Sequence, residues 1–301
     1  MIIIGAGIAG LLAATAFPQA SVWEARERRD SDHKALLRFR TTRVADLTGI
    51  EFRKVRVHKG IWYDREFKAP DIQMANMYSN KVLGRLADRS IWNIEPVDRY
   101  VAPEDFVDRL QDNVGDRVRY DAAVVGAMLR EIGKTDPLIS TMPMPALAAL
   151  LDVGGPPMPR FEHRSIKVQR FRIHGADVFQ TIYFPSPFTP VYRASITGDL
   201  LIIEATEELS HSDLMDVENA FDLKEAEHLE DREQRYGKIA PIDDVWRKNF
   251  IHEVTLRHNI YSLGRFGTWR NVLLDDIVND ISVIKRLIGS SRYEQSLQAQ
   301  K

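Results

Sequence analysis

The sequence predicts an α/β protein in which a doubly wound domain with a parallel sheet is interrupted by an inserted domain with an antiparallel sheet. Near the N-terminus, short apolar strands alternate with helical segments over residues 2–50. In the middle, residues 160–206 contain strand-like runs separated by glycine and proline turns. Near the C-terminus, residues 259–287 repeat the order of strand, glycine turn and helix. The predicted boundaries are residues 1–50, 96–153 and 257–301 for the doubly wound domain, and residues 51–95 and 154–256 for the inserted domain.

The hydrophobic periodicity predicts the elements inside this outline. Helical patterns cover residues 42–50, 71–89, 103–113, 145–151, 211–236 and 273–287. Strand patterns cover residues 52–67, 91–100, 117–124, 138–142, 166–173, 178–184, 191–204 and 259–263. The clearest linker is the stretch 154–157, which contains two glycines and two prolines.

The N-terminal motif predicts a dinucleotide site. An apolar strand is followed by glycines in the spacing G-x-G-x-x-G and then by an apolar helix. The first glycine permits a tight turn, the second lets a phosphate approach the backbone, and the third lets the helix pack closely on the strand. A second apolar strand ends in an acidic residue, which suits the hydroxyls of a ribose. The residues predicted at this site are Gly5, Gly7, Ile8, Ala9, Gly10, Glu24 and Ala25.

Composition excludes several other classes of protein. The chain has 301 residues, which is long enough to bury a core. Its content of 44% hydrophobic and 28% charged residues is that of a globular protein. A net charge of −2 gives no overall basic field for nucleic acid. The absence of cysteine excludes disulfides and thiolate chemistry, and the histidines show no ligand spacing, so no metal is expected. No segment has the roughly 18 apolar residues of a membrane span, and we expect a cytoplasmic protein.

Three short motifs, taken in order, resemble those of one group of flavoproteins. The first is the N-terminal motif, and the second is Leu138–Pro143, a short strand that ends at a proline. The third is Tyr261–Arg270, which carries Gly264 and Gly267 between a buried strand and a helix start. Together they resemble the amine oxidase, protoporphyrinogen oxidase and UDP-galactopyranose mutase group.

The resemblance implies FAD, held by a Rossmann-like domain. It places the second motif beside the cofactor, the Gly-Arg turn at the pyrophosphate, and the following helix start at the isoalloxazine. Asp275 would contact the ribityl chain, with capping of its own helix as the alternative. Arg40 should pass near the first motif and is a candidate for a phosphate, with a solvated strand arginine as the alternative. The implied cofactor residues beyond the first motif are Arg40, Thr141, Met142, Gly264, Arg265, Gly267, Trp269 and Asp275.

Candidate catalytic residues lie in the inserted domain. Tyr183, Tyr192 and Arg193 are on neighbouring predicted strands and would form a substrate wall, in which the arginine binds a carboxylate in bidentate fashion. The alternative is that both tyrosines are ordinary aromatic residues of a sheet. Lys238 would act beside the flavin through a water molecule, or would be a surface charge. Tyr192, Arg193 and Lys238 are therefore the candidate catalytic residues.

The expected function is that of an FAD-dependent oxidoreductase that acts on the C–N bond of an amine or amino-acid-type substrate. Hydride leaves the carbon next to the amine, and the resulting imine hydrolyses. One alternative is redox-neutral flavin chemistry on a nucleotide sugar, and another is a non-catalytic dinucleotide-binding module. The length is also similar to that of small virus-encoded flavoproteins that act on amino-acid-decorated thymine in DNA, which would make DNA a partner and the host cytoplasm the location. The alternating basic run Arg53–Lys59 could line a DNA groove or be a solvated strand face.

Overall fold

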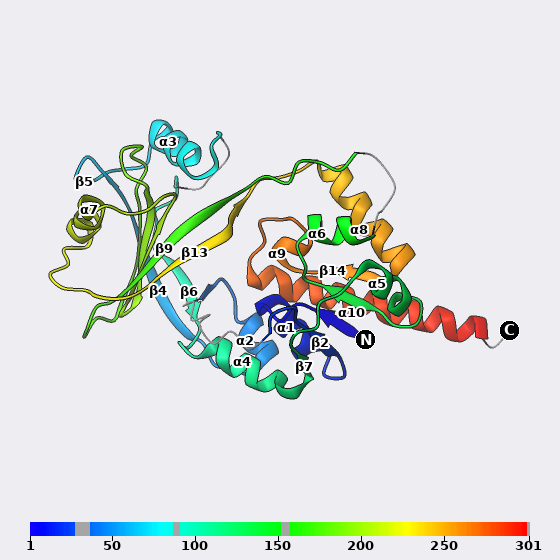
Figure 1. The fold of residues 1–301 in the computed structure, drawn as a ribbon. Coiled ribbons are helices and arrows are strands. Elements are labelled where there is room, and N and C mark those ends of the chain that lie inside the picture. Colours follow the sequence, from blue (N-terminus) through cyan, green and yellow to red (C-terminus); the bar gives the residue numbers. More distant parts are fainter. Residues whose placement is uncertain (28–36, 87–90, 152–156, 300–301) are drawn as a thin grey trace. The chain divides into compact units, whose positions relative to one another are not determined.

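The computed structural model describes residues 1–27, 37–86, 91–151 and 157–299, and within them gives no side-chain detail for 235 and 291–299 (Figure 1). These residues form two compact units. Unit 1 consists of Met1–Arg53, Tyr100–Phe161 and Pro241–Lys301, and unit 2 consists of Lys54–Arg99 and Glu162–Ala240. Most of the predicted linker 154–157 lies outside the described residues.

Unit 1 is built on a five-stranded parallel sheet. Its order is β14-β8-β1-β2-β7, so the strand order reverses at β1 and leaves a topological switch point between the carboxyl ends of β1 and β8. Ligands of open parallel sheets bind at such a point. The strands are β1 (Ile2–Ile4), β2 (Ser21–Trp23), β7 (Val118–Arg119), β8 (Leu138–Ser140) and β14 (Ile260–Ser262).

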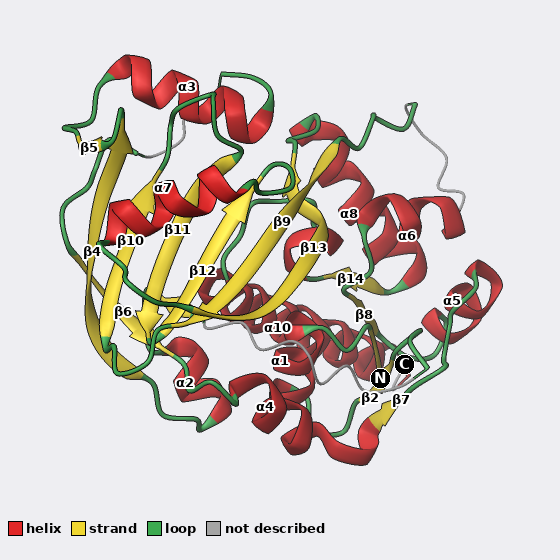
Figure 2. Cartoon of the chain, turned by 60° about the vertical axis from the view of Figure 1, so that its left-hand side comes forward, coloured by secondary structure: helices red, strands yellow, loops and turns green. Residues whose placement is uncertain are grey.

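Two groups of helices pack on this sheet. Helix α1 packs against α2, α4 and α10, and Ile3, Ile139 and Tyr261 of the strands join the core of this group. Helix α5 packs against α6 and α8, and α8 lies on β14 (Figure 2). The predicted doubly wound α/β fold is confirmed. The helices are α1 (Ile8–Ala16), α2 (Arg43–Thr48), α4 (Phe106–Val114), α5 (Gly126–Gly133), α6 (Met144–Leu151), α8 (Asp244–His258) and α10 (Leu274–Ala299).

Helix α8 belongs to unit 1, although the sequence analysis assigned residues up to 256 to the inserted domain. The reason is its packing against β14 and α5. The short elements of unit 1 are β3 (Arg38–Phe39), which pairs with β6 (Val97–Val101), the 3-10 turn η1 (Gly115–Arg117) and α9 (Gly264–Gly267).

Unit 2 is built on a curled sheet with the order β13-β9-β12-β11-β10-β4. Its pairs are antiparallel except β10 with β4. Helix α3 packs on the face of the sheet that carries Ile61 of β4, and α7 packs on the face that carries Ile182 of β10. Ile182 is paired with Gly60, the residue before Ile61, and successive side chains of a strand point to opposite faces. The two helices therefore cover opposite faces of the sheet. The elements are α3 (Ile72–Leu83), β4 (Arg53–Tyr63), β5 (Glu66–Phe67), β9 (His163–Arg172), β10 (Val178–Tyr183), β11 (Val191–Gly198), β12 (Leu200–Ala205), α7 (His211–Phe221) and β13 (Glu227–Ile239).

The helix predicted over residues 211–236 is wrong in its second half. Helix α7 ends at Phe221, where Asp222 adopts a left-handed conformation with φ of 53°. The chain then forms β13, which pairs with β9. Its charged side chains ion-pair across the strands, as in Lys167–Glu233 at 3.0 Å and Arg170–Glu230, and such pairs stabilise a polar strand.

No described helix combines the length and the apolar composition that crossing a membrane requires. Over the same residues, histidine and acidic side chains do not gather in threes as a metal site needs.

The packing of α1 on β1 requires glycine at position 10. A Cβ atom built there would lie 1.9 Å from the carbonyl oxygen of Gly5. This is backbone rather than the end of a flexible side chain, so the helix itself would have to move. Gly289, in the middle of α10, has open space instead.

We predict that Gly10→Ala lowers the free energy of unfolding by about 3 kcal/mol, because overpacking displaces α1 from β1. Gly289→Ala is the matched control and should raise it by up to about 1 kcal/mol, because alanine favours a helix interior. Denaturant unfolding of both variants checks the prediction. Equal stability of the two would contradict the packing described here.

Candidate functional site

The turn after β1 is held open by contacts from two neighbouring strands. Gly5 has φ of 95°, and its N–H donates to the carbonyl oxygen of Trp23 at 2.7 Å. The Thr141 hydroxyl donates to the Ile4 carbonyl at 2.8 Å, and its oxygen would be 2.3 Å from a Cβ on Gly5. Thr141 therefore lies directly against the glycine turn, at the carboxyl end of β8.

The start of α1 faces open space. Gly7 is the N-cap residue, and no side chain caps the helix. A Cβ on Gly7 would meet nothing within 4 Å, and its φ of −69° suits any residue. Protein packing does not require glycine here, unlike at Gly10. The helix start, with the N–H groups of Ile8 and Ala9 in its first turn, has the arrangement that binds phosphate.

Glu24 follows β2 and turns back toward the same turn. Its side chain accepts hydrogen bonds from Ala6 N at 2.7 Å and from Arg26 N at 3.0 Å, and the Arg26 guanidinium pairs with it at 3.1 Å. Burial raises the pKa of this carboxyl, but the hydrogen bonds from Ala6 and Arg26 outweigh that effect and lower it overall. A carboxylate has about four acceptor positions. The Arg26 side chain is 43% exposed.

The turn after β14 meets the start of α1. Gly264 has φ of 84°, and a Cβ on it would lie 3.0 Å from the Cβ of Ala9. Gly267 would likewise meet the Ser140 carbonyl at 2.9 Å and that of Met142 at 3.5 Å. The two glycine turns that the sequence places at opposite ends of the chain therefore lie side by side in unit 1.

Two further residues of the third motif, Trp269 and Arg265, differ in their burial. Trp269, with φ of 48°, is 2% exposed and packs edge-on against Phe161, so it serves the core. Arg265 is half-buried, and its guanidinium contacts Asn271 at 3.4 Å and the Phe266 ring. The contacts of the Arg265 guanidinium named here are thus with residues of the turn and the segment directly after it.

Asp275 has a role that the sequence did not indicate. Its carboxylate is 5% exposed and accepts hydrogen bonds from Arg40 N at 3.1 Å, Thr41 N at 3.0 Å and Thr41 Oγ1 at 2.6 Å. The cap of α10 comes instead from Asp276, which accepts from Leu273 N at 2.9 Å. Asp275 thus anchors the backbone of Arg40, whose own side chain is exposed.

In unit 2 the three candidate catalytic residues gather around an acid that sequence reasoning missed. The Tyr192 hydroxyl donates to Glu204 Oε1 at 3.0 Å, and Arg193 forms an ion pair with the same carboxylate. The Lys238 ammonium lies 4.5 Å from the centre of the Tyr192 ring. Tyr192 is fully buried, so its hydroxyl supports Glu204 rather than lining an open wall. Arg193 is 37% exposed.

The charges of this cluster depend on one another. Burial of Glu204 raises its pKa, but Arg193 and then Lys238 lower it more, to about 2. Burial raises the pKa of Tyr192 well above its ordinary value, so the phenol stays protonated. Glu204 could have been found as the one acid in the apolar strand Leu200–Ala205, in register with Arg193.

Tyr183 joins the same face of the sheet through Tyr78, whose ring it meets edge-on at 5.6 Å.

The basic run on β4 is partly neutralised, because Lys54 and Arg56 both ion-pair with Asp98, at 3.1 and 3.0 Å.

Comparisons with known proteins show the fold. No protein-family model and no curated protein matches the sequence. A solved structure of reduced UDP-galactopyranose mutase has a TM-score of 0.62 at 15% identity, covering 96% of this chain and 93% of that one. A CLA-producing fatty acid isomerase from P. acnes has 0.61 at 11% identity, covering 95% and 97%. An oxidoreductase from Methanosarcina mazei has 0.53 at 12% identity, covering 95% and 99%.

We predict that Glu204→Gln lowers the free energy of unfolding at pH 7 by about 2 kcal/mol, because Arg193 loses its counter-charge while the shape is kept. The folded pKa of Glu204, about 2, is below its unfolded value, so this stabilisation is fully present above about pH 4.5. It is lost as the pH falls toward 2. Urea unfolding of both proteins should show that the difference in their free energies of unfolding becomes smaller between pH 7 and pH 3. A difference that stays constant would contradict a charged Glu204 paired with Arg193.

Proposed function

We propose that this chain is an FAD-dependent flavoenzyme. The observation that carries the proposal is the meeting of the two glycine turns, with Gly264 against Ala9 at the start of α1. Two glycine turns, whose backbones a ligand can approach closely, thus lie beside an uncapped helix start at the switch point of a parallel sheet. Dinucleotides bind at such a point. The likeness to a UDP-galactopyranose mutase over nearly the full length of both chains supports the same conclusion.

The residues of unit 1 fit the dinucleotide part of FAD. The start of α1, with open space at Gly7, would hold the pyrophosphate, and Glu24 would accept hydrogen bonds from the ribose hydroxyls. Arg265 would add a positive charge beside the second turn. When bound, FAD supplies the acceptor for two electrons.

For the reaction, we propose oxidation of a C–N bond in an amine or amino-acid-type substrate. Arg193 is partly exposed and is the group of unit 2 best suited to bind a substrate carboxylate. Glu204 and Tyr192 would orient its guanidinium, since both are fixed by the hydrogen bond between them. A glycine-type adduct on a DNA base is one form that such a substrate could take.

A second candidate is a redox-neutral reaction on a nucleotide sugar. The specific observation in its favour is the likeness to UDP-galactopyranose mutase. In this case Arg193 would face a diphosphate rather than a carboxylate, because guanidinium binds both groups in bidentate fashion.

The absorption spectrum of the purified protein is the first test, followed by anaerobic mixing with glycine-type amines, free and attached to thymine in DNA. We expect a flavin spectrum that bleaches with one of these substrates. A flavin spectrum that stays oxidised with all of them would favour the nucleotide-sugar reaction. A colourless protein that cannot be reconstituted with FAD would overturn the proposal.

We predict that Gly7→Ala lowers the affinity for FAD at least about tenfold and leaves the unfolding midpoint of the FAD-free protein unchanged, because its Cβ meets only the open space at the helix start. FAD titration followed by fluorescence, with parallel unfolding of the apoprotein, separates the two effects. Gly289→Ala should bind FAD as the wild type does. A Gly7→Ala protein with unchanged FAD affinity would remove the pyrophosphate from this position.

A further inference from the structure

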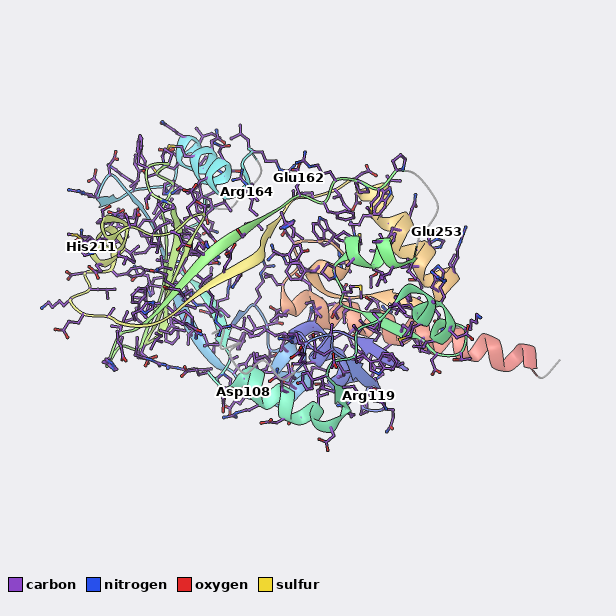
Figure 3. The ribbon with its side chains drawn as sticks, viewed as in Figure 1. Asp108, Arg119, Glu162, Arg164, His211 and Glu253 are labelled. Atoms are coloured by element: carbon purple, nitrogen blue, oxygen red, sulfur yellow. The ribbon has the colours of Figure 1, made fainter. Side chains whose placement is uncertain are left out.

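Unit 2 contains a pocket that the proposed function does not use. Its volume is about 470 Å³, within the range of small-molecule sites. Three segments form its walls: the turn between β4 and β5, the connection between β10 and β11, and the first turns of α7. His211, the first residue of α7, is labelled in Figure 3. The lining residues are Trp62, Tyr63, Asp64, Arg65, Phe184, Ser186, Phe188, Thr189, Ser212, Asp213 and Asp216.

Hydrogen bonds between the segments fix the shape of this pocket. Trp62 Nε1 donates to Asp216 Oδ1 at 2.9 Å and connects the end of β4, just before the β4–β5 turn, to α7. Thr189 Oγ1 donates to Asp213 Oδ1 at 2.7 Å and joins the connection to the same helix. Lys81 Nζ donates to the carbonyls of Phe184 and Val191, at 2.7 and 2.8 Å, and holds both ends of that connection. These hydrogen bonds connect the three walls of the pocket to one another and to α3.

The pocket combines negative charge with aromatic rings. Among the described residues that line it, Arg65 is the positive charge set against Asp64, Asp213 and Asp216. Asp213 stays ionised, because hydrogen bonds from Ser210 and Thr189 lower its pKa against the effect of burial. Behind the wall, burial lowers the pKa of Lys81 to about 7, so its charge only partly offsets these acids.

Four aromatic residues supply the remaining surface: Trp62, Tyr63, Phe184 and Phe188. Phe188 is 95% exposed, so its ring is accessible to a ligand. Carboxylates that flank exposed ring faces are the groups that recognise an organic cation.

We propose that this pocket binds a small organic ammonium ion, with the charged nitrogen near Asp216 and the carbon groups against Trp62 and Phe188. Asp216 already accepts the Trp62 N–H through one oxygen, and a carboxylate has further acceptor positions for a cation. The pocket lies on the α7 side of the sheet, whereas Glu204 and Arg193 lie on the α3 side with Tyr183. The site is therefore separate from the proposed catalytic residues.

The test is calorimetric titration of the full-length protein with choline at low ionic strength. The comparator is 3,3-dimethyl-1-butanol, which has the same shape without the charge. Choline should bind at least about tenfold more tightly than the alcohol, because both ring faces and carboxylates favour the cation. A quaternary ammonium has no nitrogen lone pair with which to form an imine, so the proposed oxidation of a C–N bond cannot contribute to the signal.

Asp216→Asn is the decisive variant, because the amide oxygen can still accept from Trp62 while the charge is removed. It should lower choline affinity about tenfold and leave the binding of the alcohol unchanged. Asp222→Asn, at the other end of α7, is the matched control and should bind choline as the wild type does. Phe188→Ala should weaken choline several-fold without affecting the fold, because the ring is exposed.

Equal affinity for choline and the alcohol would overturn the proposal, as would equal affinity of Asp216→Asn and the wild type. A dissociation constant for choline weaker than about 10 mM would also overturn the proposal, because such binding is too weak for a specific small-molecule site. Each measurement is independent of the flavin content of the preparation. A colourless protein that binds choline through Asp216 would therefore reject the proposed function and keep this site.

Discussion

Unit 1 depends on the approach of the Gly10 backbone to the carbonyl of Gly5. This contact sets how deeply the first turn of α1 lies over β1, and therefore where its N–H groups point. Because Ala9 then touches Gly264, the same contact positions the turn after β14. Thr141 completes the arrangement from β8. Three strands from distant parts of the sequence thus present their carboxyl ends to one place because one helix can lie close to one strand.

Unit 2 contains a charged carboxylate, that of Glu204, largely buried on one face of its sheet. Glu204 is 14% exposed, and its charge is retained because Arg193 and Tyr192 both donate to it. Removing Arg193 or Glu204 would leave the charge of the other without its counter-charge. The cluster is therefore a fixed polar support, in which the Arg193 side chain is 37% exposed.

The sequence predicted the parts of this structure that local chemistry determines. Gly5, Gly10 and Glu24 are close in the chain, and their spacing alone required a strand, a turn and a helix. Asp275 could not be predicted, because its partners Arg40 and Thr41 lie more than two hundred residues away and use backbone N–H groups that carry no sequence signal. The strand Glu227–Ile239 was missed because its charges resemble those of a solvated helix until β9 is placed beside it.

The anchoring of Arg40 and Thr41 by Asp275 also bears on the order in which the protein can be assembled during synthesis. When residue 240 has been made, the whole of unit 2 is available, but unit 1 still lacks β14, α8 and α10. Domains usually fold as they emerge, with the N-terminal part first. Here the first strands of unit 1 must wait for β14, α8 and α10, so unit 2, although it is inserted in unit 1, can reach its native state first.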